Sequence, residues 1–193
     1  ILLGYGDYTV DEQRLSQLVA SDTLFVRWGS VRDDNIGATV GSDNFGAGQQ
    51  AGEHLLALGR RRIAFLGHAD EHYPEFAERY RGLCSALDQA GHRADPALQA
   101  DALSSEGDGR KAAQALLDSG ADFDAVFAAS DLIAIGAIQA LNAAGKRVPQ
   151  DIAVMGFDNI PAASLTTPPL TTLVQDLKTG GELLVESLIA QIE

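Results

Sequence analysis

Acidic and hydroxyl side chains directly follow two apolar runs of this sequence. Ser130 and Asp131 come after the run 125–129, and Asp158 comes after the run 152–157. If both runs are parallel strands, their carboxyl ends meet at one edge of a sheet, which is where open α/β sheets bind ligands. A cluster of carboxylates at that edge could accept hydrogen bonds from the hydroxyl groups of a ligand.

Asp131, Asp158 and a third aspartate in a similar position, Asp43, also have purely structural interpretations. Asp43 and Asp131 stand directly before helix-like segments and could be helix N-caps, each worth about 1 kcal/mol. For Asp43 we favour the cap, whereas for Asp131 the sequence supports a cap and a ligand contact equally. Asp158 precedes a turn-like sequence, but a carboxylate directly after a buried strand favours ligand contact.

Two further side-chain types suit such a ligand. Arg79 and Arg81 stand at the start of the helix-like segment that follows the apolar run 63–66, so at least one can point over the same edge. Arginine donates to hydroxyl oxygens while carboxylates accept from hydroxyl groups, which suits a ligand dense in hydroxyls. Trp28, the only tryptophan, follows another apolar run and could form a wall for a sugar ring or belong to a core.

Glycines mark a regular alternation of helices and strands. Each of four helix-like segments ends in a glycine, which closes the last turn without a Cβ clash, and a mainly apolar run follows each time. Most of these runs lack polar alternation, which is typical of strands in a parallel sheet covered by helices on both faces. The sequence therefore predicts the α/β class with doubly wound parallel sheets. The glycines are Gly59, Gly91, Gly120 and Gly145, and the runs are 63–67, 97–103, 125–129 and 152–157.

The two ends of the chain do not fit into this sheet. Strand-like runs at 24–26 and 38–40 precede it with too few helices to cover them, and an amphipathic helix at 181–192 follows it. We therefore predict two lobes, the first of them incomplete. Residues 1–43 and 176–193 form part of the N-terminal lobe, and residues 44–175 form the C-terminal lobe.

Composition and charge narrow the class of protein. Of the 193 residues, 46% are hydrophobic and 21% charged, as in an ordinary packed globular protein. The net charge of -13 repels the phosphates of DNA and anionic membranes, and no run approaches the ~18 apolar residues of a membrane helix. A single cysteine, Cys84, excludes a disulfide framework and favours the cytoplasm. Because Ile1 opens the chain within an apolar run, we interpret the sequence as a fragment of a longer protein.

One motif suggests an alternative function, that of a dinucleotide-dependent enzyme. Residues 46–51 match G-x-G-x-x-A, and Asp70 follows at roughly the spacing of about 20 residues found in dinucleotide-binding folds. However, Asp43 would place negative charge beside a pyrophosphate, and small residues inside a helix favour close packing on the sheet. The four histidines lack metal-ligand spacing, and nucleophile and Walker motifs are absent. We therefore expect no catalytic residues, no metal and no cofactor.

The order and spacing of several blocks resemble the effector-binding core of the lactose repressor (LacI/GalR) family of transcription regulators. Two blocks are specific: V-P-Q-D-I-A-V-M-G-F-D-N at 148–159 and P-P-L-T-T-L-V-Q-D at 168–176. The remaining matches are the segments 42–64, 79–83 and 125–137. The resemblance covers nearly the whole chain.

This resemblance implies two periplasmic-binding-protein-like lobes of type I around an effector cleft. Ligand binding would change the angle between the lobes and reposition a helix-turn-helix domain, which this sequence lacks. The matching positions imply that Arg79, in the motif R-x-x-G, and Asp158, in the motif G-[FY]-D, bind the effector. The other implied cleft residues are Ser130, Asp131, Tyr73, Glu75 and, at the hinge, Gln175.

One position departs from the family pattern. Where many relatives have Asp or Asn after a strand of the N-terminal lobe, this chain has Arg27 before Trp28. The departure suggests a different hydroxyl pattern or an acidic substituent on the effector. We expect a sugar-responsive transcription regulator, with a periplasmic sugar receptor as the nearest alternative and a dinucleotide-dependent enzyme as a more distant one.

The helix-like segment 132–144 is apolar nearly all round, since only Gln139 and Asn142 are polar. Such a helix must be covered on a second side, either by neighbouring helices of its own lobe or by a partner. The resemblance implies a symmetric homodimer that uses this helix. We assign Ile135 and Ile138 to the shared face, because they lie three residues apart.

Overall fold

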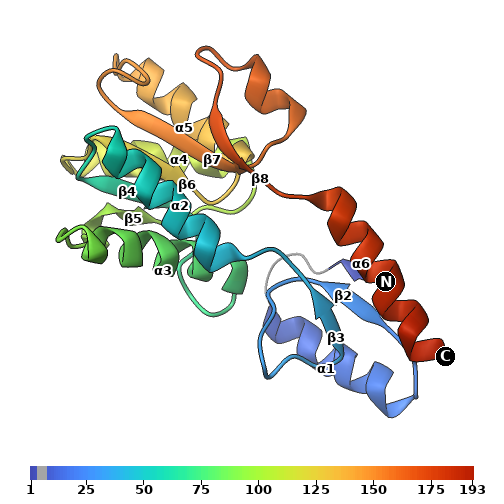
Figure 1. The fold of residues 1–193 in the computed structure, drawn as a ribbon. Coiled ribbons are helices and arrows are strands. Elements are labelled where there is room, and N and C mark those ends of the chain that lie inside the picture. The colour runs from blue at the N-terminus through green and yellow to red at the C-terminus, as the bar shows by residue number, and fades with distance from the viewer. Residues whose placement is uncertain (4–7) are drawn as a thin grey trace. The chain divides into compact units, whose positions relative to one another are not determined.

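The computed structural model describes residues 1–3 and 8–193, which form two compact units (Figure 1). Unit 1 consists of Ile1–Asp43, Asp70–Glu75 and Asp176–Glu193, and unit 2 of Asn44–Ala69 and Phe76–Gln175. Among the described residues, no helix is both long enough and apolar enough to cross a lipid bilayer.

The predicted C-terminal lobe, 44–175, includes the segment Asp70–Glu75, but in the structure this segment belongs to unit 1. The physical reason is a hydrogen bond in which the backbone N–H of Ser30 donates to Oε1 of Glu75 over 3.0 Å. The bond joins residues 45 positions apart. A local alternation of helices and strands carries no information about such a contact.

The core of unit 2 is a parallel sheet with the strand order β5-β4-β6-β7-β8. Phe65 of β4 lies opposite Phe127 of β6, which in turn lies opposite Met155 of β7. Every residue of β4 and β6 is buried, as expected for strands covered on both faces. The strands are β4 (Ile63–Leu66), β5 (Gln99–Ala100), β6 (Ala125–Ala128), β7 (Ala153–Asp158) and β8 (Thr171–Val174). The predicted α/β class with a parallel sheet is confirmed.

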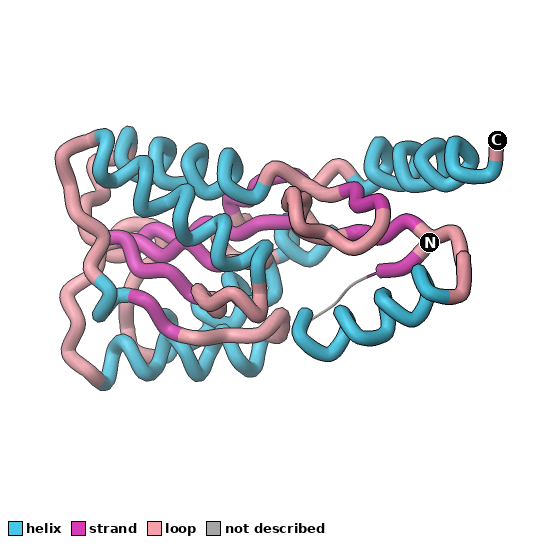
Figure 2. The backbone as a smooth tube through the Cα atoms, turned by 90° about the horizontal axis from the view of Figure 1, so that it is seen from below, coloured by secondary structure: helices cyan, strands magenta, loops and turns pink. Residues whose placement is uncertain are grey.

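Helices lie on both sides of these strands, as Figure 2 shows. Each helix contributes buried apolar side chains to the same hydrophobic core as the strands. Examples are Leu55, Leu83, Ala113 and Leu141. This arrangement leaves the carboxyl ends of the strands as the place where loops and helix starts gather. The helices are α2 (Asn44–Ala57), α3 (Pro74–Gln89), α4 (Glu106–Asp118) and α5 (Asp131–Ala143).

One predicted strand is much shorter than expected. The run 97–103 contributes only the two residues of β5, because a 3-10 turn at Pro96–Leu98 takes up its beginning. The side chain of Asp95 caps this turn by accepting a hydrogen bond from the N–H of Ala97 over 2.9 Å. The proline at the start of the turn has a fixed φ that suits this geometry.

Glycines allow helices α2 and α3 to cross at close range. A Cβ atom at Gly48 of α2 would lie 2.0 Å from the carbonyl oxygen of Arg79 in α3, and one at Gly82 of α3 would lie 2.1 Å from the carbonyl oxygen of Phe45 in α2. The prediction that small residues in the G-x-G-x-x-A motif bring its helix close to the sheet is therefore wrong for Gly48. Its close neighbour is the backbone of another helix.

Unit 1 contains a short parallel sheet in the order β1-β2-β3 and two helices among its described residues. The second strand begins two residues later than the start of the predicted run 24–26, so Arg27 and Trp28 belong to the strand itself. The last helix begins earlier than the predicted 181, because Asp176 caps it by accepting a hydrogen bond from the N–H of Thr179. The elements are β1 (Leu2–Leu3), α1 (Tyr8–Ala20), β2 (Val26–Trp28), β3 (Ala38–Val40) and α6 (Leu177–Ile192).

Candidate functional site

The side chain of Arg79 lies buried at the carboxyl edge of the unit 2 sheet, with 4% of its surface exposed. Its Nε donates to Oδ1 of Asn44 over 2.9 Å, and its Nη1 donates to the carbonyl oxygen of Ala129. The guanidinium carbon lies 3.6 Å from the ring centre of Phe157 and 5.5 Å from that of Phe76. Contacts from several elements therefore hold this cation in one orientation before any ligand arrives.

Asn44 is a residue of this site that the sequence did not reveal. It is the first residue of α2, only 2% exposed, and its amide oxygen orients Arg79. The two residues are 35 positions apart, so no local pattern connects them. The one available signal is a polar residue next to Asp43 at the start of a helix that follows a strand.

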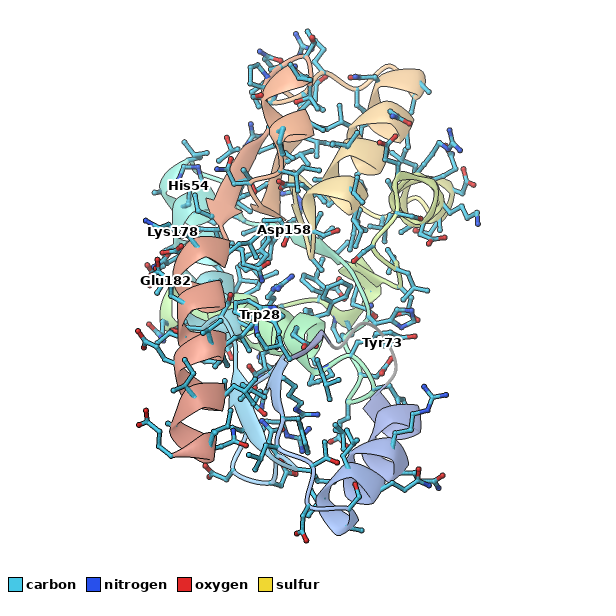
Figure 3. All side chains as sticks on the ribbon, turned by 90° about the vertical axis from the view of Figure 1, so that its right-hand side faces the viewer. Trp28, His54, Tyr73, Asp158, Lys178 and Glu182 are labelled. Carbon is cyan, nitrogen blue, oxygen red and sulfur yellow. The ribbon has the colours of Figure 1, made fainter. Side chains whose placement is uncertain are left out.

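Asp158 is the last residue of β7 and lies half-buried at the same edge of the sheet (Figure 3). Burial raises the pKa of its carboxyl to about 6, the charge of Arg79 counteracts that rise, and the charge of Asp131 adds to it. Its backbone φ is +117° and that of Asn159 is +58°, both in regions that residues other than glycine seldom adopt. The loop after β7 therefore holds this carboxyl in a strained and partly desolvated position.

Ser130 and Asp131 are both hydrogen-bonded within unit 2, at the start of α5. Ser130 is the N-cap of α5, since its Oγ accepts a hydrogen bond from the N–H of Ile133 over 3.4 Å. The cap interpretation of Asp131 is therefore wrong. Asp131 is fully buried, and its carboxylate accepts hydrogen bonds from the N–H of Ile160 and the hydroxyl of Thr172. Both of its oxygens are bonded inside the chain, and the ligand contacts predicted for Ser130 and Asp131 stay predictions.

In unit 1, Arg27 is 7% exposed and bonded to its own chain. Its Nε donates to Oγ1 of Thr39 over 3.0 Å, and its Nη2 donates to Oδ1 of Asn35. The amide of Asn35 in turn donates to the carbonyl oxygen of Ser30 over 2.8 Å. These bonds join β2 to β3 and to the loop after β2. Contact between Arg27 and an acidic effector stays a prediction.

Trp28 packs on helix α6 within unit 1 (Figure 3). A Cβ atom added at Gly180 would lie 2.4 Å from Cζ3 of the indole, so the absence of a side chain there makes room for the ring. The indole is only partly buried. Its predicted role as a wall for a sugar ring stays a prediction.

The remaining predicted site residues divide between the two units. Tyr73, which is half-buried, and Glu75 belong to the unit 1 segment Asp70–Glu75. The backbone N–H of Tyr73 donates to the carbonyl oxygen of Asp70 over 3.2 Å. Gln175 is the last residue of unit 2, and its N–H donates to the carbonyl oxygen of Asp158 over 3.4 Å. Unit 2 thus brings Arg79, Ser130, Asp131, Asp158 and Gln175 to one edge.

Ile135 and Ile138 are already covered within the chain, with 8% and 5% of their surfaces exposed. Helix α4 packs closely along α5, because a Cβ atom at Gly109 would lie 2.2 Å from the carbonyl oxygen of Ile133. The lobe's own elements therefore account for much of the apolar surface of this helix. The role of both isoleucines at a dimer interface stays a prediction, and a charged substitution at either position would also disturb the core of unit 2.

The arrangement in unit 2 suits recognition of a small polar molecule. It offers a fixed cation, a half-buried carboxyl and aromatic rings at the carboxyl ends of parallel strands, the usual location of ligand sites in open α/β sheets. Among the described side chains, no group of three or more His, Cys, Asp or Glu residues is placed to hold a metal ion.

Residues 53–193 match the family model of the periplasmic binding protein-like domain. The chain belongs to this family, within the LacI/GalR group of effector-binding domains. The resemblance inferred from the sequence and the periplasmic-binding-protein-like fold are both confirmed.

Named relatives agree with this assignment. The chain is 37% identical over 153 residues to the HTH-type transcriptional regulator CelR of Thermobifida fusca, covering 79% of this chain and 45% of that protein. It is 33% identical over 193 residues to the HTH-type transcriptional regulator MalR of Streptomyces coelicolor, covering 97% of this chain and 55% of the relative. The chain thus spans about half the length of these relatives.

A solved structure described as a complex of the transcriptional regulator CelR with cellobiose is similar to the whole chain. The TM-score is 0.91 at 33% sequence identity, covering 99% of this chain and 58% of the other.

Proposed function

We propose that this chain is the effector-binding part of a transcription regulator that senses a sugar and controls DNA binding by an attached helix-turn-helix domain. The observation that carries the proposal is the fixed pair of Arg79 and Asp158 at the carboxyl edge of unit 2. The arginine supplies donors to sugar oxygens, and the aspartate supplies an acceptor for sugar hydroxyls. Similarity to a regulator solved with cellobiose supports the choice of a sugar.

The same proposal includes a cytoplasmic homodimer that binds operator DNA through its attached domain. Its support is that the relatives are named HTH-type transcriptional regulators. The net charge of -13 agrees with a division of labour in which this segment senses the ligand and another binds DNA. The function proposed for this chain is binding, without catalysis.

The enzyme alternative is weakened by the position of the G-x-G-x-x-A motif. Gly48 faces the backbone of Arg79 at the crossing of α2 and α3, so that position serves helix packing rather than the close approach of a pyrophosphate. Saturable binding of NAD or NADP at micromolar concentration, abolished by Gly48→Val in a protein that stays folded, would restore this alternative.

Replacing Asp158 by alanine is expected to weaken sugar binding at least tenfold, because a hydroxyl that loses its buried partner costs about 1–3 kcal/mol. Isothermal titration calorimetry of the full-length protein with cellobiose, ribose and glucose would measure the effect. Asp122→Ala is the matched control, since Asp122 has a side chain 81% exposed and pairs with Arg62 outside the site. Equal affinity of the Asp158→Ala variant and the wild type for a bound sugar would remove Asp158 from the site.

A further inference from the structure

One buried carboxylate joins three segments of unit 2. Asp131, the first residue of α5, accepts a hydrogen bond at Oδ2 from the N–H of Ile160 over 2.9 Å. Its Oδ1 accepts a hydrogen bond from the hydroxyl of Thr172 in β8 over 2.6 Å. The start of a helix, an outer strand and the loop after β7 therefore meet at this side chain.

The side chain of Asp131 is tightly enclosed by its neighbours. None of its surface is exposed, and a Cβ atom at Gly156 of β7 would lie 2.2 Å from its Oδ1. Since Gly156 stands two residues before Asp158, β7 passes directly over the carboxylate just before the site. A buried carboxylate is costly unless its lone pairs are bonded, and here two donors from different segments meet it.

The loop after β7, which is hydrogen-bonded to Asp131, contains unfavourable backbone angles. Asp158 and Asn159 have φ of +117° and +58°, conformations that persist only where the surrounding bonds impose them. The loop is fixed immediately afterwards by the bond from Ile160 to Asp131. It is also fixed at Asn159, whose N–H donates to Oγ1 of Thr172 over 3.3 Å. Thr172 thus bonds both to the loop and to the carboxylate beneath it.

We infer that Asp131 is a positioning residue, which touches no ligand itself but holds Asp158 in the conformation and charge state in which it meets a sugar. The inference rests on the proposed function, because it assigns Asp158 to effector binding. It replaces the predicted direct contact between Asp131 and the ligand.

The charge of Asp131 also affects the ionisation of the Asp158 carboxyl. The charged groups that act on the Asp158 carboxyl in unit 2 are the cation of Arg79 and the carboxylate of Asp131, and a hydrogen bond from the backbone N–H of Asp131 lowers its pKa. A like charge nearby disfavours ionisation, so the charge of the Asp131 carboxylate raises the pKa of Asp158 in addition to the effect of burial. Asparagine at position 131 would keep the shape and an acceptor for Ile160 while removing the charge.

Two substitutions of Asp131 separate these effects, each measured in the full-length protein. Asp131→Ala removes the bonds to the loop, so the affinity for cellobiose should fall at least tenfold, whereas Asp131→Asn should restore it to within about threefold of wild type. Carbon NMR of the Asp158 carboxyl against pH provides a readout that needs no sugar. Asp131→Asn should lower the pKa of Asp158, a change that a merely structural role would not produce.

Thr172 provides a second test if Asp131→Ala does not fold. Thr172→Val removes the hydroxyl that bonds both to Asp131 and to the N–H of Asn159, so cellobiose affinity should fall, and Thr172→Ser should restore it. Wild-type affinity in folded Asp131→Ala or Thr172→Val, or an unchanged pKa of Asp158 in Asp131→Asn, would overturn the inference. If the wild type binds no cellobiose, that result bears on the proposed ligand alone, and the NMR titration still decides whether Asp131 acts on Asp158.

Discussion

Replacing Gly48 by alanine is expected to lower the free energy of unfolding by about 3 kcal/mol, because the new methyl group has no space. Its Cβ would lie 2.0 Å from the carbonyl oxygen of Arg79, which is rigid helix backbone rather than a flexible side chain. Relief requires α2 and α3 to move apart, which would also disturb the bond between Asn44 and Arg79. Urea denaturation followed by circular dichroism would measure the loss.

Gly107→Ala is the matched control for this experiment. Gly107 is also helical, but the one atom within 4 Å of its added Cβ is Oγ of Ser105 at 3.8 Å. Alanine there should leave the stability unchanged or raise it by up to about 1 kcal/mol, since glycine is a poor helix former. If Gly48→Ala is as stable as this control, the two helices can separate without cost and their close crossing is not a structural requirement.

Replacing Asp158 by asparagine is expected to stabilise the folded protein at pH 7 by about 2 kcal/mol while weakening sugar binding. Burial raises the pKa of this carboxyl from 3.8 to about 6, so the folded state favours the protonated form more than the unfolded state does. The contribution of Asp158 to stability is therefore fully present below pH 4 and is lost as the pH rises through about 6. The magnitude is reduced from the full shift because the side chain is partly exposed.

Chemical denaturation at several pH values would test this expectation. The wild type should lose stability between about pH 4 and pH 6 relative to Asp158→Asn, and the difference should then stay constant toward pH 7. Asp122→Asn, at a side chain 81% exposed, is the control and should follow the wild type. A difference between wild type and Asp158→Asn that does not change with pH would show that the carboxyl of Asp158 titrates normally.

Much of the unit 2 fold could be predicted because its signals are local. Completely buried strands such as β4 and β6 produce apolar runs, and glycines at helix ends such as Gly59 mark where each run begins. The first and last residues of helices and strands are harder to predict where a capping side chain shifts the boundary away from the one that the apolar pattern indicates. Asp95 shortens β5 through a 3-10 turn, and Asp176 starts α6 before its apolar periodicity becomes clear.

The candidate site could be predicted only where a rule about strand ends applies. Arg79 and Asp158 were identified from such a rule and from family motifs, and the structure brings them to one edge of unit 2. Asn44 and Thr172 were missed, because their partners lie 35 and 41 positions away in the sequence. The hydrogen bonds of Asp131 could not be predicted for the same reason: its nearest sequence feature is a helix start, while its bonding partners belong to later segments.

The packing of Trp28 on Gly180 means that tryptophan fluorescence can report on the folding of unit 1. Because Trp28 is the only tryptophan, emission excited at the red edge of the absorption band comes from unit 1 alone. Unit 2 holds the larger sheet and most of the helices among the described residues, so the far-ultraviolet dichroism reports mainly on unit 2. Comparing the two signals during one denaturation would reveal whether the units melt cooperatively or as separate folding units, without any added label.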